Sequence, residues 1–529
     1  MNSDTVSTLR KDAERALKLR RYEYAHKKIL ELLYINKNDA DAFILMAMIP
    51  LETGNIDKAI ELIKRAISLA PENHDYPVHL AKCYALQGDM FNAALWADKS
   101  SSGDLSSAFL HDTLGVVLTR IGLHQNAEQQ FVKAVSMDAT SSDYIYNLAS
   151  SQKFLGQLES AKMWYRRALE INPRDYKAYI GFASLDLKNL NCSHIKELTL
   201  LLESAKNSID KLNLSHALAL EHEKVAQYDQ AFEMLHKAKQ QRLQKLQYSF
   251  AQDQTMFDSI VDAFSDTNAT FSAGYTDSRA IFVTGMPRTG TTLVERIISG
   301  HDGVKSVGEL HNFELLLKSI TGGSQAKIST PQAMQNIVST DFYALGKAYL
   351  DSVAPLVSGK DKFVDKLPLN LLHAGFIIKA LPNCKIICLD RDPLDTIVSN
   401  YRQVFSAQYR YCDYSLCMNS TAKFYIQFKR VRALWQSLFP DNFYVINYQR
   451  LVNEPAHEAQ KLAKFCGINY QQKSLQIDKN TSPVATASAL QVREPIHNHS
   501  IGRWRHYEPY LKEVISLLKA ENINIKSSL

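Results

Sequence analysis

The sequence feature that most constrains the fold is a glycine that recurs every 34 residues in the first half of the chain. An alanine follows each glycine after five residues. The glycines are Gly54, Gly88, Gly122 and Gly156, and the alanines are Ala59, Ala93, Ala127 and Ala161. Glycine suits the left-handed end of a helix, and alanine lets two helices approach closely. The period therefore predicts stacked helix-turn-helix units.

The pattern extends in both directions from these four units. Counting back one period, Ala25 keeps the phase although Arg20 stands where glycine is expected, and Ala231 and Ala238 recover the pattern two residues out of phase. The pattern resembles the tetratricopeptide repeat. We expect seven units within residues 1–250, the sixth poorly formed. Such an array either binds a peptide or partner protein on a concave surface or serves as a packing scaffold, and the sequence leaves both readings open.

Composition and charge exclude several classes of protein. A chain of 529 residues exceeds one ordinary hydrophobic core, so at least two domains are expected. A hydrophobic content of 46% with 22% charged residues argues against disordered and membrane classes. The polar N-terminus lacks the apolar region of a secretory signal, and we expect a cytoplasmic protein without a transmembrane segment. The net charge of +6 comes with no dense Lys/Arg run, so nucleic acid is not an expected partner.

The cysteines argue against a metal site. Seven are present, an odd number, and none forms a CxxC pair. Zinc sites and dithiol chemistry favour such pairs. We therefore expect reduced cysteines and no metal.

Residues 280–300, AIFVTGMPRTGTTLVERIISG, predict a buried strand, a glycine-hinged loop and a helix. Gly285 and Gly290 permit the turn, and the helix that begins near Thr291 directs unpaired N–H groups at the loop. This arrangement predicts an anion site. The glycine spacing matches a nucleoside-triphosphate loop, but Thr291 replaces its lysine, which argues against a kinase. Arg288 lies inside the loop and can hold a phosphate or sulfate with two hydrogen bonds.

The string PRTGTTL resembles the 5′-phosphosulfate loop of sulfotransferases that use 3′-phosphoadenosine-5′-phosphosulfate. Its arginine form is most similar to the tyrosylprotein sulfotransferases. The resemblance implies an α/β P-loop-like domain with a parallel sheet in residues 278–529, after a linker at 251–277 and an all-α tetratricopeptide-like solenoid. It also implies that the loop holds the donor through Arg288, Thr289, Gly290, Thr291, Thr292 and Leu293.

Two further residues are expected to act in catalysis with Arg288. Glu309 follows the helix and would return toward the loop, where a partly desolvated carboxylate can take a proton from an attacking hydroxyl. Lys366 closes a predicted strand, where its ammonium can neutralise charge on the leaving phosphate. The family has a glutamate and a lysine in similar places. A surface glutamate and a solvated lysine are the alternatives.

Other residues are assigned to the donor by resemblance. An arginine and a serine with the separation of Arg391 and Ser399 bind the 3′-phosphate in sulfotransferases, and a tyrosine like Tyr448 lies near the nucleotide. The segment TASALQVREPIHNHSIGRWRHY resembles the family's closing loop, which adds Ser488, Arg493, Arg503 and Trp504. The same segment can also be a surface loop with incidental arginines. Asp390, Asp392 and Asp395 are expected to pair with arginines and cap a helix rather than bind a metal.

The sequence therefore predicts a sulfotransferase that moves a sulfuryl group to an acceptor hydroxyl by in-line displacement, without a metal. Protein tyrosine is the first acceptor considered, with the repeats recruiting a polypeptide. A carbohydrate, a lipid or a small molecule is the second. A kinase-like enzyme and a nucleotide-binding repeat adaptor without catalysis remain as competing functions.

Overall fold

The computed structural model describes residues 3–185, 194–265, 271–320, 336–357, 359, 361–405, 410–484 and 490–525. The chain forms two compact units. The first comprises residues 1–151 with 352–356, and the second comprises residues 152–351 with 357–529. Within the described residues, no helix is both long and apolar enough to span a lipid bilayer.

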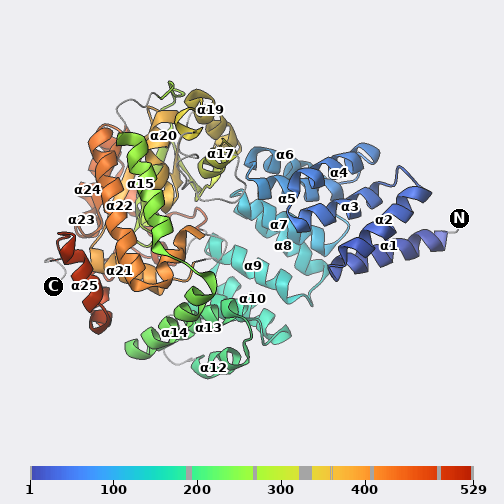
Figure 1. Ribbon diagram of the computed structural model, residues 1–529, viewed down its shortest axis with the longest axis horizontal. Coiled ribbons are helices and arrows are strands. Elements are labelled where there is room, and N and C mark those ends of the chain that lie inside the picture. Colours follow the sequence, from blue (N-terminus) through green and yellow to red (C-terminus); the bar gives the residue numbers. More distant parts are fainter. Residues whose placement is uncertain are drawn as a thin grey trace. The chain divides into compact units, whose positions relative to one another are not determined.

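The first unit is built from consecutive helices that pack in pairs, α1 with α2, α3 with α4, α5 with α6, and α7 with α8 (Figure 1). These helices are α1 Ser3–Lys18, α2 Tyr22–Ile35, α3 Ala40–Thr53, α4 Ile56–Leu69, α5 Asp75–Gln87, α6 Met90–Ser101, α7 Ala108–Arg120 and α8 His124–Met137. The next helix, α9 Ser142–Leu155, runs from the first unit into the second.

The turn inside each pair has the left-handed backbone that the recurring glycine predicted. Gly54, Gly88, Gly122 and Gly156 have φ of 90°, 85°, 87° and 83°. Arg20 occupies the same position in the first pair and keeps a left-handed φ of 55° without glycine. The alanines in phase with these turns are fully buried, as close helix packing requires, and they are Ala25, Ala59, Ala93, Ala127 and Ala161.

The second unit begins with the later repeat helices. They are α10 Leu158–Ile171, α11 Tyr176–Leu185, α12 Ile195–Ser204, α13 Ser208–Lys224 and α14 Tyr228–Leu246. Ala226 takes the place of the glycine between α13 and α14 with a φ of 59°, and Ala231 and Ala238 are buried beyond it. Helices α11 and α12 have ten described residues each.

Part of the predicted linker is helical. Helix α15, Phe250–Ser265, packs against α22, Met418–Leu438, and the rings of Phe257 and Phe424 lie 5.0 Å apart. The chain therefore passes from the repeats to the sheet along a packed helix.

A five-stranded parallel sheet lies at the centre of the second unit, which confirms the predicted α/β architecture. Its strands are β1 Ala280–Gly285, β2 Val304–Gly308, β3 Lys362–Lys366, β4 Lys385–Asp390 and β5 Phe443–Asn447. Their order is β2-β3-β1-β4-β5. The register pairs Val283 of β1 with Lys366 of β3 and Gly285 with Leu389 of β4. The residues after β1, β3 and β4 therefore meet at one edge of the sheet.

Helices cover both faces of this sheet. Ile281 and Val283 of β1 pack with α16, Thr291–Ser299, and α24, Pro455–Phe465, in one apolar core. Phe282 points the other way and lies against Tyr349 of α19, Phe342–Val353, with ring centroids 5.5 Å apart. Successive side chains of β1 point to opposite faces of the sheet, and helices cover both faces. All six residues of β1 are therefore buried, which explains its continuous apolar run.

The remaining helices of the second unit are mostly short. They are α17 Asn312–Ile320, α20 Ala374–Ala380, α21 Pro393–Arg402, α23 Tyr448–Asn453, α25 Lys512–Ala520, and the 3₁₀ segments η2 Pro368–His373, η3 Arg410–Leu416, η4 Gln472–Leu475, η5 Ile477–Lys479, η6 Gln491–Arg493 and η7 Arg503–Tyr510; the 3₁₀ segment η1 Ala354–Leu356 belongs to the first unit.

The strand order fixes where a ligand can enter. The chain leaves β1 toward β2 on one side of the sheet, and it leaves β4 toward β5 on the other side. Connections that diverge in this way open a crevice at the carboxyl ends of two neighbouring strands. The crevice lies between the loop after β1 and the segment that begins with Arg391 after β4.

Candidate active site

The loop between β1 and α16 is shaped by residues with left-handed backbone. Gly290 precedes α16 with a φ of 105°, and Arg288 has a φ of 64°. A side chain at position 290 would place its Cβ 2.6 Å from Cδ2 of Tyr448, so only glycine fits against that ring. Gly290 offers no side-chain cap, and the first N–H groups of α16 are therefore available to an anion.

The threonines of the loop lie inside it. Thr289, Thr291 and Thr292 are buried, and the hydroxyl of Thr289 donates to the Met286 carbonyl at 2.7 Å. Leu293 packs in the apolar core beneath the loop. A hydrogen bond within the loop therefore stabilises its turn, and its threonine side chains are packed inside the protein.

Helix α21 holds the loop from the other side of the crevice. The amide of Asn400 donates to the Pro287 carbonyl at 2.7 Å, and Nη1 of Arg391 donates to the Arg288 carbonyl at 2.9 Å. Sequence reasoning missed Asn400. The available signal was its spacing of four residues from Thr396, which puts two polar side chains on one buried helix face.

Four arginines lie within electrostatic reach of one another at this crevice. The pKa of Arg288 is lowered to about 10 by burial and by the neighbouring Arg402, Arg391 and Arg503. The neighbouring guanidiniums, unlike burial, make the site favour an anion. Arg402 and Arg503 both pair with Glu223 of α13, and this carboxylate offsets part of the repulsion.

Arg391 is positioned by several partners but retains a donor. Its guanidinium lies 4.8 Å from the centre of the Tyr448 ring and 3.8 Å from the Asp395 carboxylate, and it also donates to the Ser500 carbonyl. Its Nε is buried with no hydrogen-bond partner among the described residues. A buried donor without a partner costs about 1–3 kcal/mol, and a ligand oxygen would remove this cost.

The C-terminal segment closes over α21 through Asp395. This carboxylate accepts from the N–H of Gly502 at 2.8 Å and from the N–H of Trp504 at 3.1 Å. Trp504 is buried, and the guanidinium of Arg505 lies over its ring at 5.0 Å. The Trp504 ring therefore already packs against another side chain of the chain.

The three aspartates at the start of α21 have structural partners, as the sequence indicated. Asp392 caps the helix by accepting from the N–H of Asp395 at 2.9 Å, and Asp390 pairs with Arg432. Neither arrangement requires a metal.

A second group of charged residues lies at the ends of β2 and β3. The ammonium of Lys366, 1% exposed, pairs with the carboxylate of Glu309, 35% exposed, and lies 3.8 Å from the carboxylate of Glu295. Glu295 lies on α16 and accepts from the hydroxyl of Ser306. Burial raises the pKa of Glu295, while the Lys366 ammonium opposes the rise. Glu309 is thus the accessible member of a buried ionic group.

Asp365 supports the turn that carries Glu309. It accepts from the Tyr349 hydroxyl at 2.7 Å and from the N–H of Leu310 at 3.4 Å. Burial raises the pKa of Asp365 to about 7, although both hydrogen bonds lower it. A fully buried carboxyl at this place fixes the residue next to Glu309.

The other residues predicted for the donor have different surroundings. Ser399 is half-buried on α21, eight residues after Arg391. Arg493 donates to the Phe154 carbonyl at 2.9 Å and lies against the turn at Gly156. Arg503 donates to Glu223 at 3.0 Å. Ser488 lies outside the described residues.

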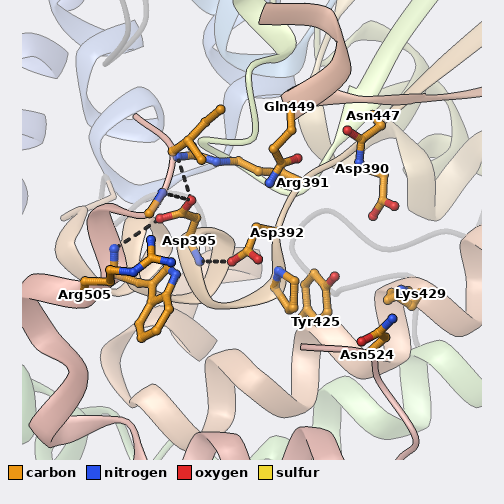
Figure 2. Close-up of a pocket in the computed structure, with 14 residues that line it drawn as sticks. Asp390, Arg391, Asp392, Asp395, Tyr425, Lys429, Asn447, Gln449, Arg505 and Asn524 are labelled. Carbon is orange, nitrogen blue, oxygen red and sulfur yellow. Dashed lines mark hydrogen bonds and ion pairs between the residues drawn. The ribbon is translucent and has the colours of Figure 1, made fainter. Parts of the chain in front are cut away.

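A pocket of about 410 Å³ opens beside Arg391, at the carboxyl ends of β4 and β5 (Figure 2). Figure 2 shows Asp392, Asp395 and Arg505 on one side and Tyr425, Lys429 and Asn524 on another. The volume lies within the range of small-molecule sites. Charged groups of both signs line it, so a polar ligand suits it better than an apolar one.

In the described part of the chain, no three His, Cys, Asp or Glu side chains lie close enough together to hold a metal ion. Of the cysteines described, Cys83, Cys384, Cys388, Cys412 and Cys466 are buried thiols and Cys417 is half-buried.

Comparison with known proteins matches two families to separate stretches of the chain. Residues 280–472 match the sulfotransferase family, and residues 40–73 and 142–175 match the tetratricopeptide repeat. An uncharacterized protein of Aquifex aeolicus is 32% identical over 374 residues, which cover 69% of this chain and 48% of that protein. A protein-tyrosine sulfotransferase of Drosophila melanogaster is 21% identical over 234 residues, 42% of this chain and 46% of that protein.

The chain thus spans about half the length of these two relatives. Among solved structures, a thermophilic tetratricopeptide protein of Thermus thermophilus is 22% identical with a TM-score of 0.30, covering 34% of this chain and 99% of its own.

Proposed function

Residues 280–472 carry a sulfotransferase family domain, and from this premise we propose that the chain moves a sulfuryl group from 3′-phosphoadenosine-5′-phosphosulfate to an acceptor hydroxyl. The observation that carries the proposal is the crevice itself. It joins a loop without the nucleotide-binding lysine, a cluster of arginines, and an ionic pair of Glu309 with Lys366 at the same sheet edge.

The arginine cluster supplies what a doubly phosphorylated donor needs. In our proposal the N–H groups at the start of α16 and the guanidinium of Arg288 bind the phosphosulfate end. The unpartnered Nε of Arg391 and the hydroxyl of Ser399 bind the 3′-phosphate. The pocket beside Arg391 has room for the rest of the nucleotide. The positive charge gathered here matches the charge of the donor and would be costly without it.

Glu309 and Lys366 are assigned to the chemical step. The acceptor oxygen forms a bond to sulfur while its proton passes to the carboxylate of Glu309. The bond between sulfur and the bridging oxygen breaks, and its electron pair stays on the 5′-phosphate of the departing bisphosphate. Lys366 stabilises this developing charge, and Arg288 with the loop N–H groups holds the sulfuryl oxygens. A preorganised donor of this kind is worth about 3 kcal/mol of barrier.

The contact between Glu309 and Lys366 suits this order of events. In the structure the ammonium of Lys366 donates to the carboxylate of Glu309, and this contact holds the two groups of the chemical step side by side. When a bridging oxygen enters, the ammonium has a second acceptor nearby. Glu295 of α16 also restrains the ammonium, since its carboxylate lies 3.8 Å from it.

For the acceptor we propose a protein tyrosine, recruited by the repeats. The similarity to a protein-tyrosine sulfotransferase and the presence of tetratricopeptide repeats support this choice. Labelled donor with tyrosine-containing acidic peptides, oligosaccharides, lipids and phenols would identify the class. Transfer to a sugar or lipid and not to peptide would reject the tyrosine assignment.

The decisive experiment compares wild type with Glu309→Gln. Adenosine 3′,5′-bisphosphate should bind both proteins by calorimetry with affinities within about threefold, because Gln keeps the shape of the side chain. Turnover of labelled donor should fall in the variant by at least about 100-fold, the usual contribution of a general base. Retained turnover would reject Glu309 as the base.

Two outcomes would reject the function as a whole. Binding of ATP in preference to the bisphosphate would favour a kinase-like enzyme. Binding of the bisphosphate without transfer to any acceptor class would favour a repeat adaptor.

A further inference from the structure

A repeat helix places one carboxylate directly in the arginine cluster. Glu223 stands at the end of α13, and its side chain is 9% exposed. It accepts from Nε and Nη2 of Arg402, from Nη2 of Arg503 at 3.0 Å, and from the hydroxyl of Tyr507. All four residues belong to the second compact unit. One carboxylate therefore joins three side chains that approach from other elements.

These partners lie on α21, which borders the crevice, and on the C-terminal segment that closes over α21. Arg402 is the last residue of α21, the helix that holds the loop through Asn400. Arg503 and Tyr507 lie in η7, just after Ser500. The carbonyl of Ser500 accepts a hydrogen bond from the Arg391 guanidinium. Glu223 thus links the end of α21 to the C-terminal segment, through Arg402 on one and Arg503 and Tyr507 on the other.

Local helix stability does not explain a carboxylate at this position. The last turn of a helix carries partial negative charge and disfavours an acidic residue there. Burial would raise the pKa of Glu223, yet pairing with Arg402 and Arg503 lowers it below its usual value. The arginines, rather than the helix, therefore account for the placement of Glu223.

The cluster needs this negative charge to hold its shape. The pKa of Arg503 is lowered first by Arg402 and then by burial, so the two guanidiniums repel each other. Glu223 lies between them and accepts from both. Without it, the mostly buried cation of Arg402 and the partly exposed cation of Arg503 would face each other beside Arg288.

The neighbouring repeat helix supports the same end of α21. Lys239 of α14 is fully buried and donates to the carbonyls of Gln403 at 3.0 Å and Ser415 at 2.8 Å. His236 of α14 bonds to the hydroxyl of Tyr401 at 2.8 Å. The end of α21 is therefore held by repeat helices on more than one side.

We infer that Glu223 is a positioning residue of the donor site, supplied by the repeats, which orients Arg402 and Arg503 beside Arg288. This inference rests on the proposed function. It gives the last repeats a part in binding the nucleotide, in addition to any recruitment of an acceptor. Glu223 itself does not touch the donor, since a carboxylate would repel it.

The test uses the full chain and adenosine 3′,5′-bisphosphate in calorimetry. Glu223→Gln should weaken binding by at least about tenfold, because breaking a buried charge pair releases the arginines from their geometry. The KM for the donor should rise by the same factor, while kcat stays within about threefold. Glu223→Asp, which keeps the charge on a shorter side chain, should recover part of the affinity.

Glu221→Gln is the matched control. Glu221 lies on the same helix, is more deeply buried than Glu223 and pairs with Lys224 rather than with an arginine of the cluster. This variant should lose stability but keep the affinity for the bisphosphate. If Glu223→Gln does not fold, Tyr507→Phe removes one bond to Glu223 and should weaken binding by about threefold, the worth of a modest hydrogen bond.

The outcomes separate the two proposals. If wild type does not bind the bisphosphate, the proposed function fails, and the inference falls with it. If wild type binds and Glu223→Gln matches the Glu221→Gln control, the inference fails and the proposed function stands. Tighter binding by Glu223→Gln would also overturn the inference. It would show that the charge of Glu223 weakens binding of the bisphosphate more than its hydrogen bonds to the arginines strengthen it.

Discussion

Asn400 provides a sharp test of how the loop between β1 and α16 is held, and from the proposed function we predict that Asn400→Ala weakens donor binding. Its side chain is fully buried. Its amide donates to the Pro287 carbonyl at 2.7 Å and to the Thr396 carbonyl at 2.9 Å, and its oxygen accepts from the Tyr414 hydroxyl at 2.9 Å. No water can easily replace these bonds in a buried site.

The magnitude follows from the groups left without a partner. Thr396 lies inside a helix, so its carbonyl can still accept a hydrogen bond from the helix backbone. The Pro287 carbonyl and the Tyr414 hydroxyl lose their buried partner, and each such group costs about 1–3 kcal/mol. We expect a loss of about 2–6 kcal/mol in the stability of the second unit. Loosening of the loop should weaken binding of adenosine 3′,5′-bisphosphate by about tenfold, or about 1.4 kcal/mol.

The assay is calorimetry with the full chain at a temperature well below unfolding, with urea denaturation for stability. Asn442→Ala is the control, because the Asn442 amide also donates to two carbonyls, of Pro382 and Cys384, both at 2.8 Å and away from the loop. This control should lose stability without losing affinity. Wild-type affinity in a folded Asn400→Ala protein would refute the view that α21 shapes the loop.

Three further predictions concern other parts of the chain. Arg391→Ala should raise the donor KM by about 10- to 100-fold with little change in kcat, since a charge-assisted bond to phosphate is lost, and an unchanged KM would contradict its role. Arg20→Gly should stabilise the first unit by about 0.5–1 kcal/mol in thermal unfolding, because its φ of 55° suits glycine, and destabilisation would contradict this. Asp365 has a pKa raised to about 7, so the folded state keeps a proton that the unfolded state releases, and stability falls as pH rises from about 4 to about 7. Asp365→Asn should remove this decline in urea titrations across that range, and an unchanged pH profile would show that Asp365 ionises normally.

Local sequence patterns predicted the elements well because their physics is local. A glycine with a left-handed backbone and a small alanine five residues later define each helix pair, whatever surrounds them. The apolar run before Gly285 and the periodic run after Gly290 likewise define a buried strand and a helix. Position 20 shows the limit of the rule, since Arg20 adopts the same backbone without glycine.

Contacts between distant segments could not be predicted in the same way. Glu223 and Arg402 are 179 residues apart, and neither helix carries a pattern that points to the other. Arg493 was assigned to the nucleotide by resemblance, whereas its guanidinium bonds to Phe154 in the repeats, 339 residues away. Such pairs depend on how whole elements pack. Glu309 and Lys366 were easier to place together, because Glu309 follows β2 and Lys366 ends β3, its neighbour in a parallel sheet.

The division of the chain at residue 152 has a consequence for how such proteins diversify. Helices α10 to α14 fold in one compact body with the sheet, whereas the earlier helices form a body of their own. A chain shortened by early repeats, in steps of 34 residues, should therefore keep the fold of the second unit. A laboratory chimera would have to keep α9 whole, because this helix crosses the boundary, whereas a cut near residue 250 would separate Glu223 from Arg402 and Arg503.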